Sequence, residues 1–210
     1  MKLARLQAYT TARQLDLPPR AKQLHHLLRN ELLEASNTGA IADTPPEVFR
    51  RVVLLSEPPP TVLEELRARS LHRHAYCIIG GEKNQDRDHR IPHFRRSDGA
   101  WFDFSIVVRE HAGALELLAY DFELRFPPGM GVPFLRYDLN FPHHDNAERD
   151  LRCHLHSGSD DMLVPAPLMT PSELLAVFIE GAQPAADRGR RTPTAYEARW
   201  YAQTHALARR

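Results

Sequence analysis

The residues whose types and spacing could do chemistry gather in one stretch, 136–161. His154 and His156 are two residues apart, so on a β-strand their side chains share a face, as do those of Arg136 and Asp138. Histidine gives and takes protons near neutral pH, arginine stabilises a developing oxyanion, and a carboxylate orients a histidine. These four residues are predicted to be catalytic. Such a set would serve metal-free RNA cleavage, in which a 2′-hydroxyl attacks the adjacent phosphate.

Other polar residues of the same stretch are predicted to contact the substrate. They are Tyr137, His143, His144 and Arg152. Arginine suits phosphate because its planar fork of N–H donors matches two oxygens at once. This hypothesis requires no cofactor and no metal ion.

The same histidines also allow a metal-site hypothesis. His154 and His156, joined by His144 or Asp160, would form a three-ligand site with a position open to water. The sequence contains no HExxH motif, no paired CxxC motif and no complete cupin pattern in support. The metal enzyme therefore stays an alternative.

A third interpretation uses an acidic strand face. Asp103, followed by Asp121-x-Glu123-x-Arg125, resembles the acidic strands of nucleases in which carboxylates hold Mg²⁺. An arginine stands where such strands carry lysine. Alternating charges are also typical of any solvated strand face, so this pattern is not specific.

The elements that must position these residues are strands. Apolar and polar residues alternate in three segments, 102–108, 120–126 and 135–141, and turn-forming residues separate them. This pattern predicts an antiparallel meander with one apolar and one polar face. The loop lengths allow Glu123 to face Arg136 across the second hairpin, where opposite charges attract.

Helices are predicted on both sides of the meander. Apolar spacing predicts helices over 3–15 and 19–35, and Thr-x-x-Glu capping boxes predict four further helix starts. The first box is expected to open a helix that runs through Val53, and the third a helix over 171–180. The boxes begin at Thr44, Thr61, Thr170 and Thr194.

The predicted fold class is α+β, with N-terminal helices, a central antiparallel β-meander and C-terminal helices packed on the sheet. The expected organisation is a helical N-terminal region over 1–70, an α+β core with the His-rich motif over 71–182, and a linker with a C-terminal helix over 183–210. Within the core, residues 82–99 are polar and aperiodic, which is typical of an exposed loop.

Composition narrows the class of protein. The chain has 210 residues and a formal net charge of +0 at pH 7, so no global positive charge drives nucleic-acid binding. It has only 2 cysteines, no long apolar run and no secretory signal pattern, so we expect a cytoplasmic protein without a disulfide scaffold or a membrane partner. Walker, GxGxxG and GxSxG motifs are absent.

The order of motifs over about residues 100–180 resembles the TumE family of toxins from bacterial toxin–antitoxin pairs. The resemblance comprises the strand meander, an Arg-Tyr-Asp strand end, a His-x-His and a following helix with Glu-Leu-Leu-x-x-Phe. The matching residues are Arg136, Tyr137, Asp138, His154, His156, Glu173, Leu174, Leu175 and Phe178. This resemblance implies growth inhibition through RNA and a neutralising antitoxin partner. The expected function is thus a TumE-like toxin or defence effector, a ribonuclease-type enzyme acting on RNA.

The competing hypothesis is non-enzymatic. Residues 1–30 carry six Lys or Arg against one acid, and residues 183–210 carry six against two. Such basic ends are also expected of an accessory subunit that docks on a protein or a protein–nucleic-acid complex.

Overall fold

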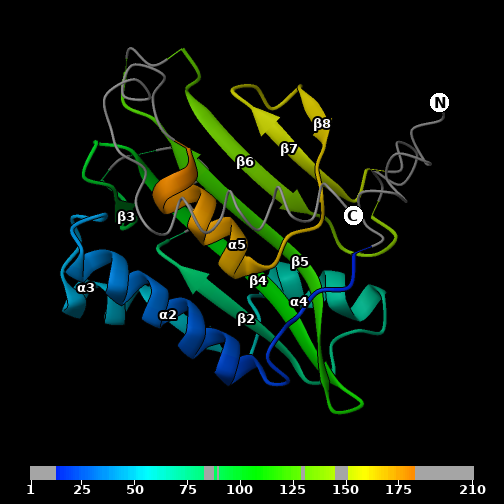
Figure 1. Cartoon of the computed structure of the whole chain (residues 1–210). Coiled ribbons are helices and arrows are strands. Elements are labelled where there is room, and N and C mark those ends of the chain that lie inside the picture. Colours follow the sequence, from blue (N-terminus) through cyan, green and yellow to red (C-terminus); the bar gives the residue numbers. More distant parts are fainter. Residues whose placement is uncertain (1–12, 83–87, 89, 129–130, 145–150, 183–210) are drawn as a thin grey trace.

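The computed structural model describes residues 13–82, 88, 90–128, 131–144 and 151–182. Its helices and strands are α2 (Ala21–Asn37), α3 (Pro45–Arg51), β1 (Val52–Leu55), α4 (Pro60–Ala68), β2 (Ala75–Gly80), β3 (Phe94–Arg95), β4 (Trp101–His111), β5 (Ala114–Arg125), β6 (Phe134–Leu139), β7 (Cys153–Ser157), β8 (Leu163–Pro165) and α5 (Pro171–Ala176). A π-helical turn, Val177–Gly181, extends α5. The strands form one eight-stranded antiparallel sheet in the order β1-β2-β4-β5-β6-β7-β8, with β3 paired to β4 (Figure 1). The predicted α+β class is confirmed.

Helices α2 and α5 lie on the apolar face of the sheet (Figure 1). Alternate residues of β4 and β5 point to this face, and their rings contact the α5 segment, where Phe178 lies 5.9 Å from Phe122 and 6.2 Å from Phe102 between ring centroids. Leu24, Leu28 and Leu32 of α2 complete the same core. Burying these side chains supplies most of the driving force for folding, about 1.5–3 kcal/mol for each large apolar residue.

The opposite face of the sheet is partly apolar and partly polar. Leu66 of α4 packs at one end of it against Cys77 and Val107. Beyond this small cluster the face carries charged and histidine side chains of β4 to β7, which are described with the functional site below. The sheet therefore places its polar residues on the side away from α2 and α5.

Local sequence explains the helix ends, with two corrections. The capping boxes at Thr44 and Thr170 are confirmed, because in each the glutamate three residues on accepts the cap backbone N–H. The helix from Thr44 was expected to run through Val53, which is wrong: it ends at Arg51, and the next four residues form β1. The helix expected from Thr61 is confirmed as α4, but its capping box is wrong, because α4 begins one residue earlier, at Pro60, without a side-chain cap.

The strand meander is confirmed, including the register that pairs Glu123 with Arg136. The β4–β5 hairpin closes with a two-residue turn, Ala112-Gly113, whose φ angles of 50° and 83° are both positive. A positive φ at both central residues defines a type I′ turn, which matches the twist of the two strands.

The prediction of an exposed loop over 82–99 is wrong for its second half. Phe94 is fully buried, and His93 and Arg96 keep only 6% and 5% exposure. The cause is the buried carboxylate of Asp43, which accepts the backbone N–H of Arg95 at 2.6 Å. A buried carboxylate requires such donors, so it fixes this segment against the body of the protein.

The predicted helix start at Thr194 and most of the predicted helix over 3–15 lie outside the described residues. The predicted helix over 19–35 is confirmed as α2. Strand β1, inside the region expected to be helical, pairs with β2.

Among the described residues, no helix has the length and apolar character needed to span a membrane.

Candidate functional site

The candidate site lies on two neighbouring strands, β6 and β7. Their antiparallel register places Asp138 opposite His154 and Arg136 opposite His156. Directly opposed residues on adjacent strands have their side chains on the same face of the sheet. The four residues predicted to be catalytic are therefore brought together, on the face away from α2 and α5.

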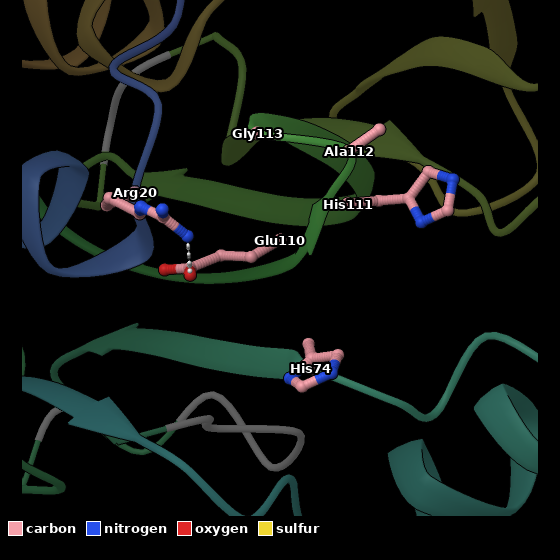
Figure 2. Close-up of a pocket in the computed structure, with 6 residues that line it drawn as sticks. All are labelled: Arg20, His74, Glu110, His111, Ala112 and Gly113. Atoms are coloured by element: carbon pink, nitrogen blue, oxygen red, sulfur yellow. Dashed lines mark hydrogen bonds and ion pairs between the residues drawn. The ribbon is translucent and has the colours of Figure 1, made fainter.

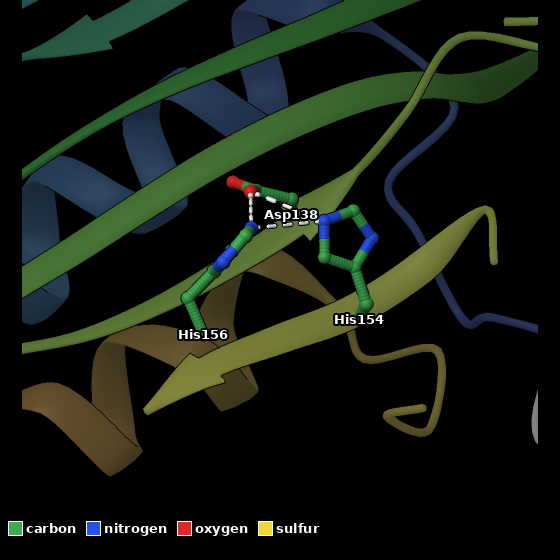
Figure 3. A group of neighbouring side chains, drawn as sticks. All are labelled: Asp138, His154 and His156. Carbon is green, nitrogen blue, oxygen red and sulfur yellow. Dashed lines mark hydrogen bonds and ion pairs between the residues drawn. The ribbon is translucent and has the colours of Figure 1, made fainter. Parts of the chain in front are cut away.

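Three of these side chains converge on one point (Figure 3). The Nε2 atoms of His154 and His156 are 3.1 Å apart. The Oδ2 atom of Asp138 lies 3.1 Å from Nε2 of His156 and 3.4 Å from Nε2 of His154. Among the described residues, these are the ligand-bearing side chains close enough to hold one metal ion. Within the described part of the chain, the acidic strand face of Asp103, Asp121 and Glu123 contains no group of side chains close enough to hold one metal ion.

The cluster is buried, and its polar atoms are unevenly satisfied. The side chains of His154 and His156 are 3% and 6% exposed, and that of Asp138 is 14% exposed. Oδ2 of Asp138 faces both imidazoles and also accepts from Nε of Arg136 at 3.0 Å. Its other oxygen, Oδ1, and the Nδ1 atoms of both histidines have no hydrogen-bond partner among the described residues. Oδ2 of Asp138 and Nε2 of each histidine thus face a common point, whereas the remaining polar atoms of the three side chains have no partner there.

Charge around the cluster favours an ionised Asp138. Burial by itself would raise the pKa of this carboxyl group. Hydrogen bonds from the two imidazoles and the charge of Arg136 outweigh that effect and lower the pKa below its ordinary value. A carboxylate that is ionised and buried is a strong ligand for a cation, because desolvation has already removed competing water.

The triangle of ligand atoms has the size of a metal site. An ion about 2.0–2.1 Å from each atom, the usual distance for zinc with nitrogen and carboxylate oxygen, would lie about 0.8–1.0 Å outside their plane. The angles between ligands at such an ion would be about 95–116°, which bracket the tetrahedral value. Three ligands in this geometry leave a position for water or substrate.

The same distances fit poorly with two histidines acting on opposite sides of a phosphate. Nitrogen atoms in those roles must be separated by at least two hydrogen-bond lengths, roughly 5.5 Å. The observed separation of 3.1 Å leaves no room for a substrate group between them. Acid–base chemistry at this site would depend on one imidazole at a time.

The predicted substrate contacts are scattered. Tyr137 was expected to bind substrate, but the strand alternation places it on the apolar face, where its ring lies 6.3 Å from that of Phe178. Arg152 donates to the backbone carbonyls of Asn140 and Leu118, at 3.0 Å each. These residues do not join the cluster.

His143 and His144 follow the end of β6. His143 is exposed in a left-handed conformation with φ of 60°, and the backbone N–H of His144 donates to Phe141. Neither belongs to the group that could hold one ion. The metal-site alternative had expected His144 or Asp160 beside the two histidines, which is wrong: the third residue of the group that could hold one ion is Asp138, and Asp160 contacts Arg136 instead. Only the β6–β7 register reveals this, because Asp138 and His154 are far apart in sequence.

A separate hollow of about 350 Å³ lies at the tip of the β4–β5 hairpin (Figure 2). In it, Glu110 accepts from Nη1 of Arg20 at 2.9 Å and from the backbone N–H of Ala21 at 3.0 Å. His111 points away from this ion pair (Figure 2). Because Ala21 is the first residue of α2, the contact fixes the start of that helix to the hairpin.

Comparison with protein-family models, with curated proteins and with solved structures finds no match for this chain. The functional assignment therefore rests on the geometry of the cluster.

Proposed function

We propose that the protein is a metal-dependent hydrolytic enzyme whose divalent ion is held by Asp138, His154 and His156. The observation that carries this proposal is the triangle of 3.1, 3.1 and 3.4 Å between their ligand atoms. Two imidazoles and one carboxylate are a ligand set used by catalytic zinc and by non-haem iron. An ion there would lower the pKa of a bound water toward 7 and make it a nucleophile at neutral pH.

Arg136 has a positioning role in this proposal. Its Nε donates to Oδ2 of Asp138 at 3.0 Å, which holds the carboxylate toward the imidazoles. Partners that orient a metal ligand usually affect metal affinity by 10- to 100-fold when they are removed. Burial by itself would lower the pKa of Arg136, but the charge of Asp138 and the hydrogen bond to it raise that pKa, so Arg136 keeps its charge.

A second candidate is the metal-free effector acting on RNA that the sequence resemblance implies. The observation in its favour is the chain of contacts from Arg136 to Asp138 to His156, which supplies a cation, an orienting carboxylate and a proton carrier. In this candidate one imidazole acts as base or acid while Asp138 orients it. The two candidates use the same residues and differ in their need for a metal ion.

The experiment measures metal content and RNA cleavage on a chain purified without a histidine tag. The wild type is compared with His154→Ala/His156→Ala and with the matched pair His143→Ala/His144→Ala, which removes the same number of histidines outside the cluster. The metal proposal expects about one zinc, iron or manganese ion per chain in the wild type and the matched pair, and little in the cluster variant. RNA cleavage should then be lost with a chelator and regained with metal.

Other outcomes separate the alternatives. Cleavage that survives chelation and is lost in the cluster variant would support the metal-free effector. Growth arrest on expression, relieved only by the cluster variant, would support an effector of either kind. A wild type that neither binds these ions nor cleaves RNA would contradict both, and the non-catalytic accessory subunit would then be the better account.

A further inference from the structure

Arg136 connects the candidate metal site to an exposed loop. Its Nε contacts the buried carboxylate of Asp138, and its Nη1 lies 2.7 Å from Oδ1 of Asp160. Asp160 belongs to the loop between β7 and β8, and its side chain is 51% exposed. Nη1 also lies 3.7 Å from Oε2 of the buried Glu123. The guanidinium group therefore has inner contacts with Asp138 and Glu123 and an outer contact with a surface carboxylate.

The contacts with Asp138 and Asp160 differ in how readily an anion from solution could replace the carboxylate that Arg136 contacts. The inner one is shielded, because Asp138 is only 14% exposed. The outer one is an exposed ion pair, and such pairs typically contribute 0.2–1 kcal/mol. An oxyanion from solution would therefore compete with Asp160 more readily than with Asp138.

The position of the outer contact suits a ligand that also reaches the ion. Oδ2 of Asp138 would lie about 2.1 Å from the ion, and it is 3.0 Å from Nε of Arg136. Nε is thus within about 5 Å of the ion, and Nη1, which contacts Asp160, is two covalent bonds farther along the group. One tetrahedral oxyanion with one oxygen on the ion and another on Nη1 can bridge such a span. The planar fork of arginine donors matches two oxygens of such a group.

We propose that Asp160 occupies the place of a substrate oxyanion on Arg136, and that the substrate carries a phosphate or carboxylate group next to the bond that is hydrolysed. In this arrangement one oxygen of the substrate binds the ion and another replaces Asp160 on Arg136. The inference rests on the proposed metal site, since the ion supplies the second anchor. It identifies Arg136 as a substrate-binding residue as well as a positioning residue.

The test compares Asp160→Asn with Asp161→Asn, which removes an equal charge from the next residue of the same loop. Each variant is loaded with Mn²⁺, and binding of orthophosphate and, in a second arm, of acetate is measured by titration calorimetry. Asp160→Asn is expected to bind the anion more tightly than the wild type, by up to about fivefold, because a competing carboxylate is gone. Asp161→Asn should change binding by less than about 1.5-fold, since a screened surface charge acts weakly at a distance.

A third variant tests the arginine itself. Arg136→Lys keeps the positive charge but lacks the fork, and it should weaken anion binding by about tenfold or more. Equal effects of the two loop variants, or unchanged binding in Arg136→Lys, would overturn the inference. The arm with the tighter binding identifies phosphate or carboxylate as the preferred group.

Metal binding is measured on every variant, so the two proposals fail in different ways. A chain that binds no Mn²⁺ contradicts the proposed metal site. A chain that binds Mn²⁺, with unchanged affinity in the two loop variants, and shows none of the expected anion effects contradicts only the role of Arg136 and Asp160 in substrate binding.

Discussion

The metal site predicts a specific coupling between divalent ions and thermal stability. An ion that binds the folded chain at a free concentration of 100 times its Kd stabilises it by about 2.7 kcal/mol. For a chain of this size each kcal/mol raises Tm by about 2–4 °C. Zinc at that concentration should therefore raise the Tm of the wild type by roughly 5–11 °C.

Asp138→Asn should remove this effect. The amide has nearly the same shape as the carboxylate but no charge, so it is a poor third ligand. The metal-free variant should itself be less stable by about 2–4 kcal/mol, because charged hydrogen bonds are worth about 1.5–3 kcal/mol each and those sharing one oxygen do not add fully. The three donors concerned are Nε of Arg136 and Nε2 of both histidines.

The control is Asp121→Asn. Asp121 pairs directly with Asp138 in the β5–β6 register and lies on the same face, but it is outside the group that could hold one ion. Scanning calorimetry with and without zinc should show the full metal-dependent shift in this control. A shift in Asp138→Asn as large as in the wild type, or its loss in both variants, would refute the assignment of Asp138 as a ligand.

Further predictions concern the fold that carries the site. Burial lowers the pKa of both His25 and His93. The unfolded chain therefore binds more protons than the folded one, and the free energy of unfolding should fall as pH decreases below about 6.5. Urea unfolding at pH 7.5 and 5.5 measures this, and equal stability at the two pH values would contradict it. Ala112→Asn should stabilise the type I′ turn by about 0.5–1 kcal/mol, seen as a higher urea midpoint with unchanged slope. Gly80→Ala should destabilise the protein by about 1–3 kcal/mol, because the new Cβ would lie 2.1 Å from the ring of Phe104; an unchanged midpoint would contradict this.

Much of the fold was predictable because the strands that form the centre of the sheet are amphipathic. A period of two over 102–108, 120–126 and 135–141 specifies both the strands and their buried face. The short segment Val52–Leu55 was not predictable in this way. A run of four apolar residues is typical of a buried strand and equally of a helix end. This segment is a strand because it pairs with β2, which lies further along the chain.

The candidate site was predictable in part. Alternation within each strand correctly groups Arg136 with Asp138 and His154 with His156. The same alternation places Tyr137 on the opposite face, so its expected role conflicted with the pattern itself. The contact between the two pairs depends on how β6 and β7 align across a connection of thirteen residues, and local sequence does not determine that register.

Burial of the cluster is costly, and a bound cation would offset that cost. The orphaned atoms Oδ1 of Asp138 and Nδ1 of both histidines lie in a sheet whose other face is a packed apolar core. Each unsatisfied buried polar atom costs about 1–3 kcal/mol, a large amount against a total stability of about 5–15 kcal/mol. An ion at the common point would bind the other atoms of these side chains, Nε2 and Oδ2, and would leave the orphaned atoms as they are. Its binding free energy, about 10–16 kcal/mol at structural zinc sites, would still offset the cost of burying the cluster. Because a register slip of one residue would turn His154 and His156 to the opposite face, ion binding would also select the native alignment of β6 and β7.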